Sequence, residues 1–190
     1  MIRALLLGGG AGTRFGGAKL LAATTSDALP IGVRAARSLI SGAGNALAIV
    51  RTGDAALANA LREAGCDVLE SAESARGLGA SIAAAVKASR DADGWLVALA
   101  DMPLVLPATH RAVAEALSRG ARLAAAADAS GRRGHPVGFS SELFDDLAAL
   151  DGDEGARSVV ERHRAWLELV RVDDPGIFFD IDTPGDLAAG

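Results

Sequence analysis

The strongest constraint on the fold is the alternation of short apolar runs with stretches of helical periodicity along most of the 190 residues. Strands that alternate with helices indicate βαβ units and a mostly parallel sheet covered on both faces. We therefore expect an α/β fold of three layers, and the length favours one domain. The expected strands are residues 2–7, 46–50, 67–69, 95–99, 123–127 and 167–172. The expected helices are residues 29–40, 54–64, 79–88, 107–117, 141–150 and 153–163, several of them entered through start signals such as Asp54, Pro107 and Ser141.

One segment interrupts the alternation. Residues 131–138 read GRRGHPVG, which predicts a loop that leads into an irregular or antiparallel strand. We expect this segment to mark the seam between two halves of the domain, residues 1–127 and 128–190. Nothing in the composition indicates a linker or an internal repeat.

Composition excludes several classes of function. A formal charge of −5, no tyrosine and few other aromatic residues argue against a nucleic-acid partner. Cys66 is the single cysteine, so a disulfide within the chain or a thiolate metal cluster is excluded, and we expect it to be a small buried residue. No apolar run approaches the roughly 20 residues of a membrane span, and the N-terminal run is too short for a signal peptide. We expect a cytoplasmic protein without membrane contact.

A glycine-rich loop follows the first expected strand. The stretch from Gly8 to Lys19 holds six glycines in twelve residues, together with Arg14. In open α/β sheets the carboxyl ends of the strands face the ligand crevice, and glycines allow backbone N–H groups to approach phosphate oxygens. Two known glycine motifs do not fit: Thr13 breaks a dinucleotide fingerprint, and Lys19 is preceded by Ala18 and followed by Leu20, which breaks a P-loop.

The same residues resemble a more specific signature. GGGAGTRFGGAK is similar to the nucleotidyltransferase motif [AG]-[AG]-G-x-x-x-R-[FM]-G-x-x-K of the MobA-like superfamily. Further segments resemble that family in the same order, and they point to its molybdenum cofactor cytidylyltransferase-like branch. These segments are GLGASI (residues 77–82), ADMP (100–103), RGHPVGF (133–139), GDEGAR (152–157) and DIDTPGDL (180–187).

The resemblance implies a three-layer αβα, Rossmann-like fold of the nucleotide-diphospho-sugar transferase type, with a mostly parallel mixed sheet. It implies Mg²⁺-dependent transfer of CMP from CTP to molybdopterin with release of pyrophosphate, the nucleotide held by residues 1–127 and the acceptor by residues 128–190. A molybdenum enzyme or its chaperone is a further partner that it implies. Nucleotidyl transfer brings two polyanions together, so it needs a divalent ion and fixed positive groups.

Specific residues can meet these needs. Arg14 and Lys19 suit the triphosphate and the leaving pyrophosphate, because a guanidinium binds phosphate bidentately and an ammonium acts as a compact charge. Asp101 follows the apolar run WLVALA, so it should emerge at the tip of a central strand, where a carboxylate can bind Mg²⁺. The alternative for Asp101 is capping of the helix near Pro107. By resemblance Asp182 supplies a second metal carboxylate and Asp180 a structural one; capping of the last short helix is the alternative for both.

The remaining assignments come mainly from the resemblance. Asp173 and Asp174 are expected to be solvated turn residues. The expected nucleotide-binding residues are Gly8, Gly9, Gly10, Gly12, Arg14, Lys19, Gly79 and Ser81, with helix capping as the alternative for Ser81. The expected acceptor-binding residues are His135 and Arg157; a turn histidine and a first-turn helix residue are the alternatives. His110 and His163 fall on helix patterns as surface or core positions.

The segment after Lys19 departs from the family pattern. Relatives have K-L-L-x-P-x-x-G-x-P-L, whereas this chain reads KLLAATTSDALPIG and lacks the first proline of the nucleotide pocket. Gly9 is typical of guanylyltransferase-like members, while GDEGAR and RGHPV favour the cytidylyl side, so CTP is preferred over GTP. Two other classes stay open: an NAD(P)H-dependent oxidoreductase similar to nicotine blue oxidoreductase, and a non-catalytic protein that delivers the cofactor.

Overall fold

The protein is built around one seven-stranded mixed sheet with the strand order β3-β2-β1-β4-β6-β5-β7. The computed structural model describes residues 1–8, 19–23 and 28–189. The strands are β1 (Ile2–Leu7), β2 (Leu47–Arg51), β3 (Asp67–Ser71), β4 (Gly94–Leu99), β5 (Leu123–Ala127), β6 (Arg133–Ser140) and β7 (Leu167–Arg171). The α-helices are α1 (Ile31–Ala43), α2 (Ala55–Glu63), α3 (Leu78–Ala88), α4 (Pro107–Ser118), α5 (Phe144–Ala148) and α6 (Arg157–Arg162).

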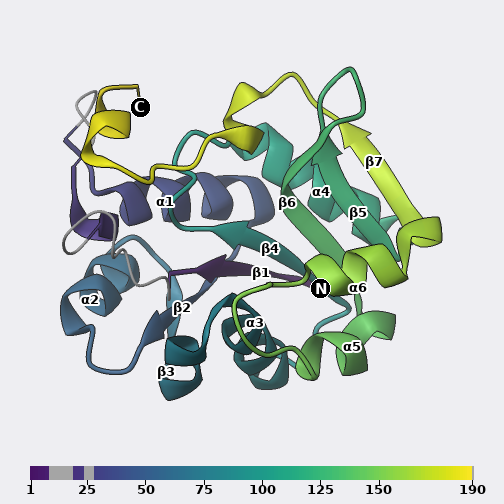
Figure 1. Ribbon diagram of the computed structural model, residues 1–190, viewed down its shortest axis with the longest axis horizontal. Helices are drawn as coiled ribbons and strands as arrows, with labels where there is room; N and C mark the ends of the chain where they lie inside the picture. Colours follow the sequence, from purple (N-terminus) through teal and green to yellow (C-terminus); the bar gives the residue numbers. More distant parts are fainter. Residues whose placement is uncertain (9–18, 24–27, 190) are drawn as a thin grey trace.

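The helices cover both faces of the sheet, as the alternation predicts (Figure 1). Buried residues of α1, α2 and α4 pack on one face, and those of α3, α5 and α6 pack on the other. Strand β1 serves both cores, because side chains along a strand alternate between faces. Ala4 and Leu6 join the first core, while Leu5 and Leu7 join the second. The α/β, three-layer expectation is confirmed.

The sheet is mostly parallel, with one exception at its centre. β1 pairs with β2 and β4 in parallel, β2 with β3, and β5 with β7. β6 runs antiparallel to both β4 and β5. The antiparallel strand expected from residues 131–138 is therefore present as β6, but the loop before it is shorter than expected: the turn covers residues 128–132 and β6 begins at Arg133. Pro136 fits inside β6 because it lies where the pairing with β5 shifts register between Ala125 and Ala127, and a proline cannot donate to the ladder.

Several helix boundaries differ from the expectations. Asp54 caps α2 as predicted, since its side chain accepts a hydrogen bond from Leu57 N at 3.2 Å. Residues 153–156 are not helical, and the expected helix 153–163 shortens to α6. The expected helix 141–150 divides into a 3-10 turn at Ser141–Leu143 and α5, and Ser141 caps neither. Within the described chain, none of the helices has both the length and the apolar character that a membrane span needs.

Candidate active site

The carboxyl ends of β1 and β4 lie side by side at one edge of the sheet. Leu7 pairs with Leu99, and Ala100 N donates to Leu7 O at 3.1 Å. Gly8 continues from β1 and is buried, and a Cβ there would lie 3.3 Å from Ile49 O. The start of the glycine loop and Asp101 therefore meet at the same edge, as the sequence predicts. Gly9, Gly10, Gly12 and Arg14 lie outside the described residues, so their nucleotide-binding roles stay predictions.

Lys19 joins the two predicted metal carboxylates. It begins a short 3-10 helix, Lys19–Leu21, and the turn that follows is tied to α1 by a hydrogen bond from Ile31 N to Ala22 O of 2.9 Å. Lys19 Nζ lies 3.0 Å from Asp101 Oδ2 and 3.0 Å from Asp182 Oδ1. The lysine side chain is 11 % exposed, whereas those of Asp101 and Asp182 are 31 % and 47 % exposed. We call Lys19, Asp101 and Asp182 the carboxylate site; both acidic groups remain within reach of a ligand.

The electrostatics of this site couple four groups. Burial disfavours the Lys19 ammonium, but attraction and hydrogen bonds from Asp101 and Asp182 outweigh it, so the pKa of Lys19 is raised above its ordinary value. Desolvation raises the pKa of Asp180, and the negative charges of Asp182 and Asp101 act in the same direction. Asp180 is thus close enough to interact electrostatically with both carboxylates. Negative charge is therefore concentrated near Lys19.

The last segment of the chain is held so that the Asp182 carboxylate meets Lys19. Ile181 is fully buried, and its N–H donates to Asp101 O at 2.9 Å. The final 3-10 helix, Pro184–Ala189, is preceded by a turn in which Asp186 Oδ2 accepts from Asp182 N at 3.1 Å and Thr183 N at 2.7 Å. Asp186 therefore supplies the side-chain hydrogen bonds of this turn. Asp101 is likewise not the cap of α4, whose N-cap residue is Leu106.

The donor set fits a divalent cation that also has ligands from elsewhere. Within the described residues, no group of three or more histidine, cysteine, aspartate or glutamate side chains is arranged to hold a metal. The carboxylates of Asp101 and Asp182 nevertheless both lie 3.0 Å from the Lys19 ammonium, so they converge on one point in space. Mg²⁺ commonly takes one or two protein carboxylates and completes its shell with substrate phosphates and water.

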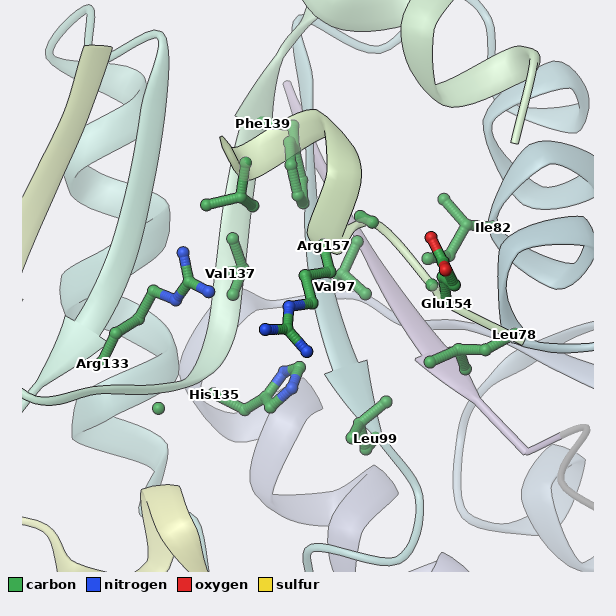
Figure 2. Close-up of a pocket in the computed structure, with 14 residues that line it drawn as sticks. Leu78, Ile82, Val97, Leu99, Arg133, His135, Val137, Phe139, Glu154 and Arg157 are labelled. Atoms are coloured by element: carbon green, nitrogen blue, oxygen red, sulfur yellow. The ribbon is translucent and has the colours of Figure 1, made fainter. Parts of the chain in front are cut away.

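A pocket of about 270 Å³ lies beside this edge, against β4 and β6 and between α3 and α6 (Figure 2). We call it the side pocket. Its walls are mainly apolar, and its polar side chains are Arg133, His135, Glu154 and Arg157. Arg133, His135 and Val137 share one face of β6 because side chains alternate along a strand. The structure thus brings together the two predicted acceptor-binding residues, His135 and Arg157.

His135 lines this pocket, and its surroundings disfavour the charged imidazolium. Burial lowers its pKa; Arg133 acts in the same direction, while the charge of Asp101 and a backbone hydrogen bond with Val97 oppose it. Among the described residues, no group lies at hydrogen-bond geometry to the buried Nδ1 of His135. Leu99, two residues before Asp101, also lines the side pocket, so the pocket adjoins the carboxylate site.

The charged groups of the side pocket are incompletely paired. Figure 2 shows the guanidinium of Arg157 reaching from α6 toward His135, with Glu154 on the far side near Ile82. In the described part of the chain, Arg157 has no carboxylate within ion-pair distance, and Arg133 is 4.0 Å from Glu161. Arg157 is exposed at the pocket mouth. A cation in this position is available to an anionic group of a ligand.

Gly79 and Ser81 lie at the start of α3, where packing explains them. Gly79 N donates to Gly152 O at 2.8 Å, and a Cβ at Gly79 would lie 2.6 Å from Asp151 O. Ser81 Oγ donates to Gly77 O at 3.0 Å, so its hydroxyl bonds to the preceding turn, and Gly77 is the N-cap residue. The GLGASI and GDEGAR segments therefore pack on each other. Contact of either residue with a nucleotide stays a prediction.

Sequence reasoning missed three residues near this edge. Arg133 and Glu154 line the side pocket, and their places inside the RGHPVGF and GDEGAR segments were the available signal. Asp174, expected to be solvated, is buried. Its neighbours Asp173 and Pro175 resemble a turn, so no local pattern distinguishes it. Cys66 is buried as expected, and burial raises its thiol pKa to about 11.

Comparisons with known proteins show the family and the fold of this chain. The family model described as the MobA-like NTP transferase domain matches residues 4–166. Rv0371c from Mycobacterium tuberculosis H37Rv is 27 % identical, with a TM-score of 0.81 over 100 % of this chain and 97 % of its own. A manganese complex of Rv0371C aligns at 24 % identity, with a TM-score of 0.77, over 97 % of this chain and 95 % of its own.

More distant structures share the fold. A nucleotidyl transferase from Methanothermobacter thermautotroptrophicus (Mth528) is 22 % identical, with a TM-score of 0.81 over 98 % of this chain and 94 % of its own. A CMP:2-keto-3-deoxy-manno-octonic acid synthetase complexed with CTP is 10 % identical, with a TM-score of 0.74 over 98 % of this chain and 95 % of its own. Curated protein sequences give no match. The nucleotide-diphospho-sugar transferase type of fold is thereby confirmed.

Proposed function

Because the chain belongs to the MobA-like NTP transferase family, we propose that it is a divalent-metal-dependent nucleotidyltransferase that transfers CMP from CTP to a molybdopterin-type acceptor. One observation supports this most: Lys19 Nζ lies 3.0 Å from each of two carboxylates at the carboxyl edge of the sheet. A polyphosphate needs this combination of a fixed cation and metal-binding acids. The net charge of −5 argues against nucleic acid as the acceptor.

Asp101 and Asp182 would hold the metal, with Asp180 as an auxiliary negative charge. When bound, Mg²⁺ supplies positive charge that offsets the repulsion between the triphosphate and an anionic acceptor. With Asp101 and Asp182 bound to a metal, the Lys19 ammonium would be free of both carboxylates and could neutralise phosphate. In this proposal Lys19 contacts the two acids when no ligand is bound and the triphosphate when the nucleotide is bound.

In the reaction, an oxygen of the acceptor's terminal phosphate attacks the α-phosphorus of the triphosphate. The bond between that phosphorus and the α–β bridging oxygen breaks, and pyrophosphate leaves with the bonding electron pair. Lys19 and Arg14 stabilise the negative charge of the leaving group, which is an electrostatic task. Gly9, Gly10 and Gly12 would supply backbone N–H groups to the phosphates, whereas the N–H of Gly8 already donates to Ile49 O at 2.9 Å and Gly8 would only leave room for the triphosphate. Gly79 and Ser81 would lie near the base or ribose.

The side pocket is proposed to bind the acceptor. A cavity of about 150 Å³ accommodates benzene, so one of about 270 Å³ can hold a fused pair of rings between its apolar walls. Arg157 and Arg133 can bind an anionic group, and the His135 ring can form a hydrogen bond with a polar group of the acceptor. In this assignment residues 1–127 carry the nucleotide and residues 128–190 supply most polar contacts to the acceptor.

The test is pyrophosphate release in single-turnover reactions with CTP, GTP, ATP, NADH or NADPH, a molybdopterin acceptor, and either Mg²⁺ or EDTA. The proposal expects Mg²⁺-dependent release that needs the acceptor and is fastest with CTP. Release fastest with GTP would replace the cytidylyl assignment with a guanylyl one. Oxidation of NADPH without pyrophosphate release from any triphosphate, or acceptor binding without turnover, would contradict nucleotidyl transfer.

A further inference from the structure

Asp174 is a buried carboxylate that the proposed chemistry does not use. It is 5 % exposed, whereas Asp173 beside it is exposed. Asp174 Oδ2 accepts hydrogen bonds from Leu106 N at 2.9 Å and from the Thr109 hydroxyl at 2.6 Å, and Oδ1 accepts from Gly176 N at 2.9 Å. A buried acidic group needs such partners. This arrangement is therefore a built feature of the fold.

Two of the three donors belong to the first turn of α4. The N-cap residue of this helix is Leu106, which has no side-chain oxygen to accept hydrogen bonds from the unpaired N–H groups of the first turn. Asp174 accepts one of these N–H groups, that of Leu106, from 68 positions away in the sequence, and a carboxylate suits the positive end of a helix. The cap therefore also fastens the C-terminal segment to the helix that follows the loop of Asp101.

The C-terminal segment follows that loop over its length. A Cβ at Gly176 would lie 2.3 Å from Leu104 O, so the two backbones touch. Farther along, Ile181 N donates to Asp101 O at 2.9 Å, and Asp182 comes next in the chain. Figure 1 shows the same segment, in yellow, returning past α4 toward α1. Asp174 is the first of three attachments that end at the carboxylate site.

We propose that Asp174 is a positioning residue for the metal-binding acids: by fastening the C-terminal segment to the loop between β4 and α4, it sets where Asp182 lies relative to Asp101. This inference rests on the proposed function, which assigns these two acids to a metal ion. Thr109 shares the role, because its hydroxyl makes the shortest of the three hydrogen bonds.

The test is Mn²⁺ binding to the full-length protein by titration calorimetry, without nucleotide and with CTP. Groups that orient metal ligands typically change affinity by about 10- to 100-fold, so Asp174→Asn should weaken Mn²⁺ binding at least ~10-fold. Asp173→Asn is the matched control, because it removes the same charge one residue away at an exposed position, and it should bind Mn²⁺ like wild type. Circular dichroism would establish that each variant is folded at the temperature used.

A second pair of variants covers the case in which Asp174→Asn does not fold. Thr109→Val removes the hydroxyl and should weaken Mn²⁺ binding, while Thr109→Ser keeps it and should restore the affinity. If folded Asp174→Asn, or Thr109→Val in its place, binds Mn²⁺ as tightly as Asp173→Asn while Asp182→Asn binds it weakly, the metal assignment stands and the positioning role is overturned. If Asp182→Asn binds like wild type, the metal assignment itself fails and the positioning role falls with it.

Discussion

The carboxylate site and the side pocket adjoin each other at one edge of the sheet, yet they balance charge in opposite ways. In the first, two acids share the ammonium of Lys19, so the negative charge is partly compensated without a ligand. In the second, His135, whose pKa is lowered, lies near Arg157, which has no ion-pair partner among the described residues. We propose that the first site exchanges the ammonium for a metal ion and that the second binds an anion. This contrast underlies our assignment of the metal and nucleotide to one site and the acceptor to the other.

The largest expected effect on the reaction rate comes from a substitution in the carboxylate site. Asp101→Asn removes one of the two proposed metal ligands and should lower the rate of pyrophosphate release at least ~100-fold, comparable to the loss of one preorganised transition-state group. The side chain is 31 % exposed at a turn, so the fold should persist. Stopped-flow detection of pyrophosphate, with circular dichroism as the folding control, checks this, and a near-wild-type rate would remove Asp101 from the reaction.

Lys19→Gln tests whether a metal ion replaces the ammonium, because it should lower the reaction rate and raise the affinity for Mn²⁺. The pyrophosphate release rate should fall about 100-fold, since the phosphate-binding cation is lost. Mn²⁺ binding without nucleotide should become tighter, because no ammonium competes for Asp101 and Asp182. Titration calorimetry measures the second effect. Unchanged or weaker Mn²⁺ binding would show that Lys19 does not hold the place of the metal.

Arg157→Ala tests the other side of the comparison. Loss of one exposed anion contact should raise the KM for the acceptor about 10-fold, or roughly 1.4 kcal/mol, while kcat and CTP binding stay unchanged. Arg164→Ala, an exposed arginine on the neighbouring 3-10 helix Arg164–Trp166, is the matched control. Steady-state kinetics with varied acceptor would decide; equal KM values for the two variants would move the acceptor out of the side pocket.

The smallest effect concerns stability and the buried His110. Burial lowers its pKa to about 4, although Asp174 acts in the opposite direction. Below about pH 6.5 the His110 imidazole is therefore protonated in the unfolded chain but not in the folded protein. The free energy of unfolding consequently decreases as the pH falls from 6.5 toward 4. From pH 7 to 5.5 this amounts to about 1 kcal/mol. Urea unfolding at both pH values should show a smaller drop for His110→Gln than for wild type; an equal drop would assign the pH dependence to other groups.

How much the sequence predicts depends on whether the determining contacts are local. Asp101 and Gly8 follow apolar strands, and the parallel sheet places such positions at one edge. Lys19 and Asp182 were found through family motifs, and the structure brings both to Asp101. Asp174 could not be found in this way, because two of its hydrogen-bond donors, Thr109 and Leu106, lie 65 and 68 positions earlier in the chain.

The same reasoning applies to the elements that differed. In residues 131–138 the glycines and the proline predict a loop before the antiparallel strand. Pairing with β4 and β5 on both sides shortens this loop and makes most of the segment a strand. Residues 153–156 have a helical pattern but lie next to α3, where Gly79 approaches Gly152 and Asp151 closely. Tertiary contacts overrode local preference at both places, and both border the side pocket.

The central claim is that the carboxylate site holds a metal ion together with a nucleoside triphosphate. The most direct measurement is thermal unfolding with CTP, with and without Mg²⁺, for wild type and Asp182→Asn. Ligand at ~100 times its dissociation constant adds about 2.7 kcal/mol, which moves the midpoint of a domain of this size by about 5 to 10 °C. The account predicts this rise for wild type only when Mg²⁺ is present, and its loss in Asp182→Asn. A rise that is the same without Mg²⁺, or the same in the variant, would contradict it.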